Sequence, residues 1–324
     1  MRFATRANGT TDGELMLVSQ DGARCLPMGA RWPNLLHAIT DWNALLADAK
    51  TLSATLDAGG GDSVSRDTLL APLPRTWQWL DGSAFANHGI LMQKAFDLPT
   101  LETYPPLMYQ GMSHRFLAPY EDVALPTEAD CIDFEGEFGI ITDDVPMGCS
   151  AEDALAHIRL ILLINDWSLR AVAPREMKTG FGWIQAKPAC SAAPIAVTPD
   201  ELGDSWRNGR VCLPLRVEVN GAWFGNPSGD AMEYGFHDLI AHAARTRPLC
   251  AGTIIGSGTV SNPDYRQVGS TCISERRAIE MIEQGHPVTP FLSFGDHVRM
   301  RAGEDDSIFG EIDQRVAAHI ATHP

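Results

Sequence analysis

Residues 133–142, Asp-Phe-Glu-Gly-Glu-Phe-Gly-Ile-Ile-Thr, alternate polar and apolar side chains. A period of two is typical of a half-buried β-strand, and it places Glu135 and Glu137 on one face. Two like charges held so close favour a cation between them, because their repulsion would otherwise raise a pKa and cost stability. An oxygen-only shell suits magnesium, calcium or manganese. For this stretch alone, two solvated acids on an exposed strand are the alternative.

The length of 324 residues exceeds what one minimal core needs, and a prior of roughly 150 residues per domain favours two units. We expect a small N-terminal domain over residues 1–74 and a larger catalytic domain over residues 75–324. Three successive glycines at 59–61 mark a flexible break shortly before this boundary. Within the first unit we expect a strand near residues 15–18 and a helix near residues 35–46.

Strand patterns dominate the larger unit. Residues 213–219 end at Asn220-Gly221, a pair that tolerates the positive φ of a tight hairpin turn. Residues 151–163 instead predict a helix with Ser150 as its N-cap. With few helices between the strands and no strand–helix–strand alternation, we expect a β-rich α+β fold.

The charge balance limits the partners of the chain. It has 41 acidic and 25 basic residues and a net charge of -16, which repels nucleic acid and anionic lipid. An anionic substrate would therefore need a cation and basic side chains inside its own cleft. The seven cysteines lack the paired spacing of a zinc or redox site. The N-terminus has no apolar signal stretch, and no apolar run reaches the roughly 20 residues of a membrane span, so we expect a cytoplasmic protein.

Three further segments carry groups suited to an active site. The segment Asn165-Asp-Trp-Ser168 directly follows the apolar run 160–164, so the carboxylate of Asp166 emerges where a buried segment ends. Lys187 follows Arg170 at a distance of 17 residues, and Gly256-Ser-Gly-Thr-Val-Ser261 offers backbone N–H groups and hydroxyls that can bind an anion. Each has an ordinary alternative, because Asp166 can be a turn cap, Lys187 a surface charge, and the glycine-rich segment a tight turn.

In this order the segments resemble the fumarylacetoacetate hydrolase family. The resemblance spans roughly residues 75–324 and rests on Asp133-Phe-Glu-Gly-Glu137, Asn165-Asp-Trp-Ser-Leu-Arg170, Lys187 and Gly256-Ser-Gly-Thr259. It implies a mixed β-roll catalytic domain around one Mg²⁺ or Ca²⁺ ion, with a small N-terminal β-containing domain. Mn²⁺ also accepts carboxylate oxygens, so it stays a third candidate. The metal ligands of the family correspond here to Glu135, Glu137 and Asp166.

The resemblance also implies the residues around the metal. Asp81 would join the metal shell, and His88, seven residues later, would activate water. Lys187 and Arg170 would add positive charge for the substrate carboxylate and the developing oxyanion. The other implied residues are Tyr109, Gly258 and Thr259 in the substrate pocket, and Glu275 as the nearest candidate for the glutamate that orients the histidine.

The chain departs from the family pattern at two pocket positions. Ala173 stands three residues after Arg170, where the hydrolases place a glutamine, and Ser83 stands where a tyrosine is expected. These changes leave the metal site intact and the substrate open.

We expect an enzyme that hydrolyses a C–C bond in a β-diketo acid of the fumarylacetoacetate or acylpyruvate type. The same metal site could instead support isomerisation, decarboxylation, hydration or dehydration of a 2-oxo acid. A metal-stabilised binding protein without turnover is the alternative from another class. The expected partner is a small-molecule oxo-acid, and resemblance to relatives favours a homodimer.

Overall fold

The computed structural model describes residues 1–97, 105–303 and 308–320. Among these residues, twelve strands form one large mixed sheet and five strands form a second sheet. The strand order of the large sheet is β4-β3-β2-β1-β14-β11-β10-β19-β6-β7, with β13 paired to β11 and β5 paired to β1. The sheet-rich α+β fold predicted from the sequence is confirmed.

The strands are short, and most of them pair in antiparallel fashion. The large sheet contains β1 (Arg2–Arg6), β2 (Glu14–Val18), β3 (Arg24–Pro27), β4 (Asp62–Ser63), β5 (Leu69–Leu70), β6 (Trp79–Gly82), β7 (Met108–Gln110), β10 (Gly136–Thr142), β11 (Ile158–Asn165), β13 (Ser191–Ala192), β14 (Ile195–Val197) and β19 (Ile254–Gly256). The second sheet contains β18 (Ala222–Gly225), β17 (Leu215–Val219), β20 (His297–Ala302), β21 (Ile312–Ala318) and β8 (Val123–Leu125). The remaining pairs are β9 (Ile132–Asp133) with β12 (Ser168–Leu169), and β15 (Trp206–Arg207) with β16 (Arg210–Val211).

Helices connect and cover the sheets. The α-helices are α1 (Leu35–Ala38), α2 (Trp42–Asp57), α3 (Ala86–Phe96), α4 (Ala151–Ala154), α5 (Ala173–Thr179), α6 (Phe236–Ala244), α7 (Tyr265–Val268) and α8 (Ile273–Gln284). The 3-10 helices are η1 (Ile39–Asp41), η2 (Arg66–Thr68), η3 (Glu128–Asp130), η4 (Leu155–His157), η5 (Pro199–Ser205) and η6 (Gly229–Ala231). In the part of the chain that the structure describes, none of these helices has the length and apolar character needed to cross a bilayer.

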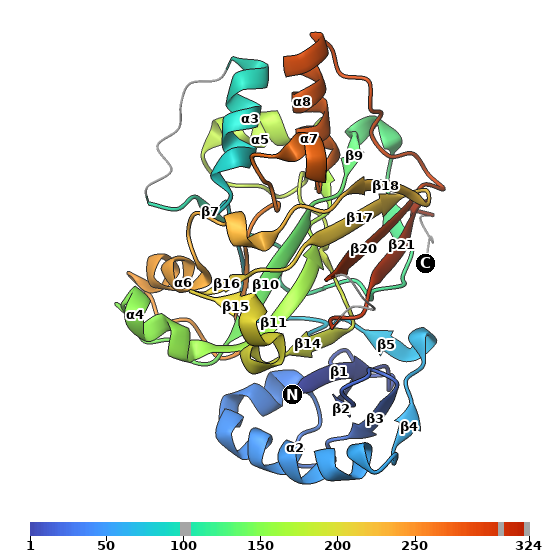
Figure 1. Cartoon of the computed structure of the whole chain (residues 1–324), viewed down its shortest axis with the longest axis vertical. Coiled ribbons are helices and arrows are strands. Elements are labelled where there is room, and N and C mark those ends of the chain that lie inside the picture. The colour runs from blue at the N-terminus through green and yellow to red at the C-terminus, as the bar shows by residue number, and fades with distance from the viewer. Residues whose placement is uncertain (98–104, 304–307, 321–324) are drawn as a thin grey trace.

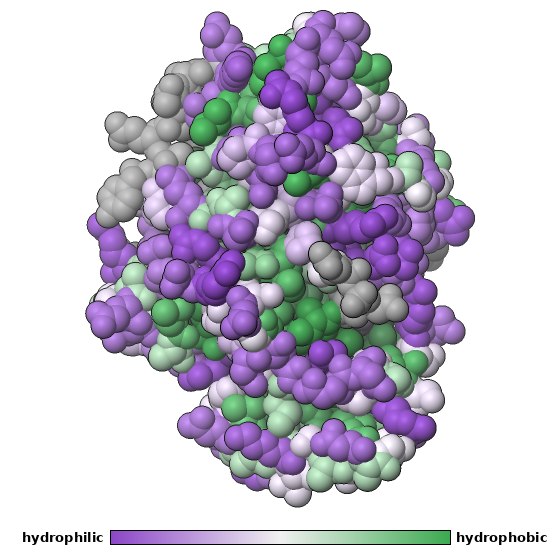
Figure 2. Space-filling model, viewed as in Figure 1, coloured by the Kyte–Doolittle hydropathy of each residue, from purple (hydrophilic) through white to green (hydrophobic). Residues whose placement is uncertain are grey.

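The N-terminal elements occupy one end of the molecule. Figure 1 shows β1 to β4 and α2 at this end, and α3 and α8 side by side at the other. Strand pairing joins the N-terminal strands to the rest of the large sheet. Strand β1 pairs with β14, and Phe3 lies opposite Ala196. The N-terminal strands therefore extend the sheet that carries the centre of the molecule. The face in Figure 2 is mostly hydrophilic with scattered apolar patches.

The central strand β11 explains how the two halves of the core meet. Its side chains alternate between two apolar clusters: Ile161 and Leu163 pack into the larger one, whereas Leu162 and Ile164 pack into the one that contains α2. A strand buried on both faces has no need of polar residues and reads as a continuous apolar run. The large sheet thus separates the N-terminal helix layer from the core of the larger unit.

This two-sided burial corrects one prediction from the sequence. The helix predicted over residues 151–163 is wrong beyond residue 157, because α4 and η4 end there and β11 begins at Ile158. The N-cap was placed correctly, since the Ser150 hydroxyl accepts a hydrogen bond from the Asp153 N–H. A short apolar run fits a buried strand and a buried helix equally well, so periodicity alone could not decide between them.

Other local predictions are confirmed. Asn220 and Gly221 both have positive φ, 51° and 77°, and form the turn between β17 and β18. The predicted strand near residues 15–18 is β2, and the helix predicted near residues 35–46 is split into α1, η1 and the longer α2. The strand over residues 133–142 exists as β9 and β10, but β10 is buried on both faces instead of half-buried.

Candidate active site

Four carboxylates meet at the centre of the large sheet. One oxygen from each of Asp81, Glu135, Glu137 and Asp166 can be chosen so that all four lie within 4.8 Å of one another. Asp81 lies in β6, Glu135 directly precedes β10, Glu137 lies in β10, and Asp166 is the residue after β11. The metal ligands predicted from the sequence are therefore brought together, although Asp81 and Asp166 lie 85 residues apart in the chain.

Pairing of the strands fixes the positions of these acids. Gly136 lies opposite Asn165 in the β10–β11 ladder, and the Asp166 N–H donates to the backbone oxygen of Glu135 at 3.0 Å. The side-chain oxygen of Asn165 accepts from the Glu135 N–H at 3.1 Å. Because the backbones of Glu135 and Asp166 are bonded to each other, their side chains leave the sheet at the same place.

Glycine is required at position 256 on the strand between the acids. β19 lies between β6 and β10, with Gly256 opposite Asp81. A Cβ built at Gly256 would lie 2.5 Å from Asp81 Oδ1 and 2.9 Å from Glu137 Oε2. Any side chain there would therefore push the two carboxylates apart.

Two cations are paired with the ligand carboxylates. Lys187 Nζ lies 2.7 Å from Glu135 Oε2 and 2.5 Å from Asp166 Oδ2, and Arg170 contacts Glu135 Oε1 at 2.5 Å. Burial alone would raise the pKa of Glu135, but Lys187 and Arg170 together hold it well below its ordinary value. Burial opposes the charge on Lys187, yet the carboxylates of Asp166 and Glu135 raise the pKa of the amine above its ordinary value. Glu135 and Lys187 are thus a charged pair.

The other two acids of the cluster, Glu137 and Asp81, add excess negative charge. Both carboxylate oxygens of Glu137 are buried and have no hydrogen-bond partner among residues 1–97, 105–303 and 308–320. Burial raises the pKa of Glu137 well above its ordinary value, and the charges of Asp81 and Asp166 raise it further. Burial also raises the pKa of Asp81, with Asp166 adding to the effect. Unpaired buried oxygens and mutual repulsion are what a hard divalent cation would relieve, so these residues fit a metal ion.

Neutral donors complete the surroundings of Asp166 and Asp81. The Tyr109 hydroxyl donates to Asp166 Oδ2 at 2.7 Å, and burial raises the pKa of this hydroxyl well above its ordinary value. The Cys190 thiol contacts Asp166 Oδ1 at 3.0 Å. The Gly258 N–H donates to Asp81 Oδ1 at 3.2 Å, and Thr259 is buried beside it in the chain. Two predicted pocket residues, Tyr109 and Gly258, therefore hold the acids directly.

A histidine–carboxylate pair lies near the acidic cluster. His88 is in the first turn of α3, and its Nδ1 is 2.9 Å from Glu275 Oε2 in the first turn of α8. The Glu275 side chain is fully buried, whereas 19% of the His88 side chain is exposed. A positive charge on His88 would also lower the Glu135 pKa, after the larger effects of burial, Lys187 and Arg170, so His88 lies near Glu135. The predicted partner Glu275 is thus placed against His88.

Asp133 was not assigned a role from the sequence, although it begins the acidic motif. Its carboxylate accepts the N–H groups of Ile273 and Ser274, at the start of α8, at 2.7 and 2.9 Å. It also accepts from Arg170 Nε at 2.8 Å. The buried carboxylate of Asp133 thereby joins α8, which carries Glu275, to Arg170, which contacts Glu135. The position of Asp133 at the start of the motif Asp133-Phe-Glu-Gly-Glu137 was the sequence signal that could have identified it.

Trp183 is a second residue that sequence reasoning missed. Its ring meets the Tyr109 ring edge to face, with centroids 4.7 Å apart and planes at 77°. Lys187 Nζ lies 5.6 Å from the centroid of the Trp183 ring. The two positions that depart from the family pattern are Ser83, which is exposed, and Ala173, which begins α5. The position of Trp183, four residues before Lys187, was the only sequence signal for it.

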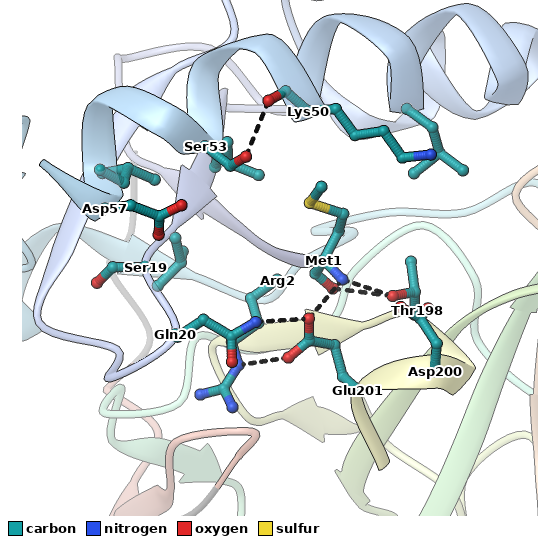
Figure 3. A pocket seen from close by; sticks show the side chains of 14 residues that line it. Met1, Arg2, Ser19, Gln20, Lys50, Ser53, Asp57, Thr198, Asp200 and Glu201 are labelled. Carbon is teal, nitrogen blue, oxygen red and sulfur yellow. Dashed lines mark hydrogen bonds and ion pairs between the residues drawn. The ribbon is translucent and has the colours of Figure 1, made fainter. Parts of the chain in front are cut away.

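A separate cavity of about 530 Å³ lies between α2, β2 and η5. Figure 3 shows that Arg2 and Gln20 in this cavity both reach Glu201. Burial would raise the pKa of Glu201, but its partners lower it below the ordinary value. No member of the acidic cluster lines this cavity. The acidic cluster is therefore the better candidate active site.

Comparison with known proteins identifies relatives of both parts of the chain. The family model described as fumarylacetoacetate hydrolase C-terminal matches residues 78–317, and that described as fumarylacetoacetase N-terminal domain 2 matches residues 1–75. The human mitochondrial oxaloacetate tautomerase FAHD2B is 26% identical over 229 residues, which cover 65% of this chain and 69% of the relative. The 2,4-didehydro-3-deoxy-L-rhamnonate hydrolase of Sphingomonas sp. (strain SKA58) is 25% identical over 181 residues, 55% of this chain and 59% of the relative.

A solved structure extends the likeness to the whole fold. Maleylpyruvate hydrolase from Sphingobium sp. SYK-6, in complex with manganese(II) ion and pyruvate, superposes with a TM-score of 0.66. The match covers 98% of this chain and 99% of the other at 18% identity. At this identity the likeness establishes the fold alone.

Proposed function

Because the chain belongs to the fumarylacetoacetate hydrolase family, we propose that it is a divalent-metal-dependent hydrolase that cleaves a C–C bond in a β-diketo acid of the fumarylacetoacetate or acylpyruvate type. The observation that carries the proposal is the pair of His88 and Glu275 near the acidic cluster. A carboxylate bonded to one nitrogen of an imidazole orients the other nitrogen as a base, and cleavage by water requires such a base.

The metal would be held by Asp81, Glu135, Glu137 and Asp166. When bound, a magnesium, manganese or calcium ion coordinates oxygens of the oxo-acid and withdraws electron density from its ketone. Lys187 and Arg170 keep Glu135 ionised and in place before the ion arrives. The maleylpyruvate hydrolase structure contains a manganese(II) ion and pyruvate, which supports a metal and an oxo-acid as the partners of a protein with this fold.

His88 would take the proton of the attacking water. An ionised Glu275 can only accept a hydrogen bond, so the proton of His88 lies on Nδ1 and Nε2 keeps a free lone pair. As Nε2 removes a proton, the water oxygen bonds to the carbonyl carbon of the acyl group. The C–C bond then breaks, and its electron pair stays with the carbon next to the ketone of the oxo-acid fragment. That carbon takes up the proton, giving a carboxylic acid and a 2-oxo acid.

The substrate pocket would be lined by Tyr109, Gly258 and Thr259. Tyr109 and Gly258 donate hydrogen bonds to Asp166 and Asp81, so they position the ligand acids as well as bordering the pocket. Thr259, 5% exposed, offers a hydroxyl at the same loop. The Thr259 hydroxyl is a neutral donor that suits an anionic substrate, because it would bind the substrate without neutralising the acids that hold the ion.

The test is an assay of the purified protein with magnesium against acetylpyruvate and fumarylpyruvate, following the release of pyruvate. We expect His88→Gln to lower kcat by about 10² to 10⁴-fold, the usual contribution of a general base. His286→Gln changes an exposed histidine outside the site and should leave kcat unchanged. Unchanged turnover in His88→Gln would remove the base from the mechanism, and failure to form the two acids would reject hydrolysis.

Keto–enol tautomerisation of an oxo-acid is the second candidate. It is favoured by the human relative, which is named an oxaloacetate tautomerase. It uses the same metal and a proton-transfer group but no attack by water. Proton NMR of the products in deuterated water separates the candidates: two carbon fragments indicate hydrolysis, deuterium at the carbon next to the ketone without cleavage indicates tautomerisation, and loss of carbon dioxide indicates decarboxylation.

A further inference from the structure

The indole N–H of Trp183 is an unsatisfied donor beside the candidate active site. Its Nε1 is buried and has no hydrogen-bond partner within the described residues 1–97, 105–303 and 308–320. Buried polar groups in folded proteins are nearly always paired, and each exception calls for an explanation. A donor without a protein partner at a ligand site is explained when the ligand supplies the acceptor.

The ring is fixed next to the groups that surround the acids. It packs edge to face against Tyr109, whose hydroxyl is bonded to Asp166. It also lies near Lys187, which is bonded to both Glu135 and Asp166. Trp183 therefore borders the place where an oxo-acid would lie once it is bound at the acidic cluster.

The segment that carries Trp183 is held by a single carboxylate. Glu176, in α5, accepts the backbone N–H groups of Ile184, Gln185 and Ala186 at 3.1, 2.9 and 3.0 Å. The Ala186 oxygen accepts in turn from the N–H of Leu169, in β12. The chain directly after Trp183 is thus held by Glu176 at residues 184–186 and by Leu169 at Ala186.

We propose that Trp183 determines substrate specificity by donating its indole N–H to an oxygen at the end of the oxo-acid that points away from the metal. The inference rests on the proposed function, in that it takes an oxo-acid to bind at the acidic cluster. The charged donors of the site are already committed, Lys187 to Glu135 and Asp166, and Arg170 to Asp133 and Glu135. A neutral donor is thus left for the far end of the substrate.

Such a donor selects substrates by the cost of leaving it unpaired. A site built to hydrogen-bond a ligand oxygen rejects the analogue that lacks it, whereas an apolar wall discriminates weakly. The substrate class is therefore a 2-oxo acid with an oxygen-terminated tail, such as a second carboxylate. The flat ring would contact the carbon chain that joins the two ends.

The experiment measures binding to the full-length, magnesium-loaded protein by calorimetry. Two matched pairs of probes differ only at the far end: 2-oxoglutarate with 2-oxopentanoate, and 2-oxoadipate with 2-oxohexanoate. We expect the wild type to prefer one or both of the dicarboxylates. We expect Trp183→Phe, which keeps a ring and removes the N–H, to weaken binding of the preferred dicarboxylate by about tenfold and to leave its methyl-ended partner within twofold.

The control variant is Trp77→Phe, which changes an indole that is 60% exposed and belongs to no part of the site. It should bind all probes like the wild type, and magnesium affinity and Tm should be the same in both variants. Equal weakening of both members of a pair in Trp183→Phe would indicate a merely structural role and overturn the proposal. No change, or no binding of any probe to the wild type, would overturn it as well.

None of these probes has a β-diketo bond to cleave, so the result is independent of turnover. If acylpyruvates are hydrolysed while Trp183→Phe binds like the wild type, the specificity proposal fails and the proposed function stands. If acylpyruvates are untouched while the dicarboxylate preference depends on Trp183, the proposed hydrolysis fails and the specificity proposal stands.

Discussion

The floor and the rim of the candidate site are built in opposite ways. The floor consists of Asp81, Glu135, Glu137, Asp166 and Lys187, and each of these residues is 7% exposed or less. The rim is the segment 176–186, where Met177, Phe181 and Ile184 are 59%, 97% and 82% exposed. Charged groups are thus buried in the floor, while large apolar groups face outward in the rim.

The difference teaches how chemistry and selectivity can be separated. The acids of the floor leave paired strands, so many backbone hydrogen bonds fix their positions. The rim is instead closed on itself, because the three hydrogen bonds that Glu176 accepts come from residues 184–186 of the same segment. Changes in the rim should therefore alter which substrate binds without disturbing the acids, whereas changes in the floor should affect metal binding and stability together.

The largest effect is expected for Lys187→Met. The variant leaves Glu135 and Asp166 buried without their cation, and breaking a buried pair on one side costs about 3–5 kcal/mol. Urea denaturation in the presence of a chelator should reveal this loss, and magnesium should reduce it by supplying positive charge. Lys50→Met, on the exposed surface, should change the free energy of unfolding by less than about 0.5 kcal/mol. Equal stability of both variants in chelator would contradict a charged floor.

Glu137→Gln should have the next largest effect, with opposite signs in the two metal states. Removing a ligand charge should weaken magnesium binding on the order of 10²-fold or more. Without metal the same change relieves repulsion from Asp81 and Asp166, so the Tm in chelator should rise above that of the wild type. Calorimetry and thermal melts with and without magnesium measure both signs.

The matched control is Glu233→Gln, an exposed position that should behave like the wild type in both states. A lower Tm of Glu137→Gln than of the wild type in chelator would mean that Glu137 stabilises the metal-free protein. This outcome would contradict the destabilisation that we expect from its unpaired oxygens.

Gly256→Ala should destabilise the floor by crowding. The added Cβ would lie 2.4 Å from Trp79 Cη2 and 2.5 Å from Asp81 Oδ1. Overpacking of this kind costs about 1–3 kcal/mol, and displacement of Asp81 should also weaken metal binding. Gly89→Ala, in α3 with no atom within 4 Å of the new Cβ, should be neutral or slightly stabilising in a thermal melt. A Gly256→Ala protein as stable as Gly89→Ala would show that the strand moves to accommodate the methyl group.

The smallest effect is expected in the rim, for Glu176→Gln. An amide accepts fewer hydrogen bonds than a carboxylate, so the amides of residues 184–186 should exchange with deuterium faster, and KM should rise a few-fold with little change in kcat. Glu152→Gln, on an exposed helix turn, should leave both measurements unchanged. If exchange at residues 184–186 is unaltered, another contact holds the rim.

The hydrogen bonds that Glu176 accepts from residues 184–186 should depend on pH in a defined direction. Burial would raise the pKa of Glu176, but three backbone N–H groups lower it below its ordinary value of 4.5. A lowered folded-state pKa means that the contact is fully present above pH 4.5 and is lost as the pH falls through the folded value. The protection factor at residues 184–186, which is the intrinsic exchange rate divided by the measured rate at the same pH, should therefore fall only at acidic pH in the wild type.

The sequence alone determined the features that depend on neighbours in the chain. The spacing of Glu135 and Glu137 predicted two acids that face the same way, and Asn220-Gly221 specified a turn with positive φ. Asp166 was a candidate site residue because it lies at the end of an apolar run, where a polar side chain can leave the core. Periodicity and turn preference act over a few residues, so they are legible without a fold.

Only the tertiary structure decided which distant groups meet. It made β11 a strand, because both of its faces are buried, and it placed Glu275 against His88 although the two are 187 residues apart. It also made glycine necessary at position 256, where a Cβ would meet Asp81 and Glu137, and it placed Trp183 beside Tyr109 and Lys187. These facts depend on strand order and helix packing, which arise from burial of surfaces far apart in the chain and leave no local pattern in the sequence.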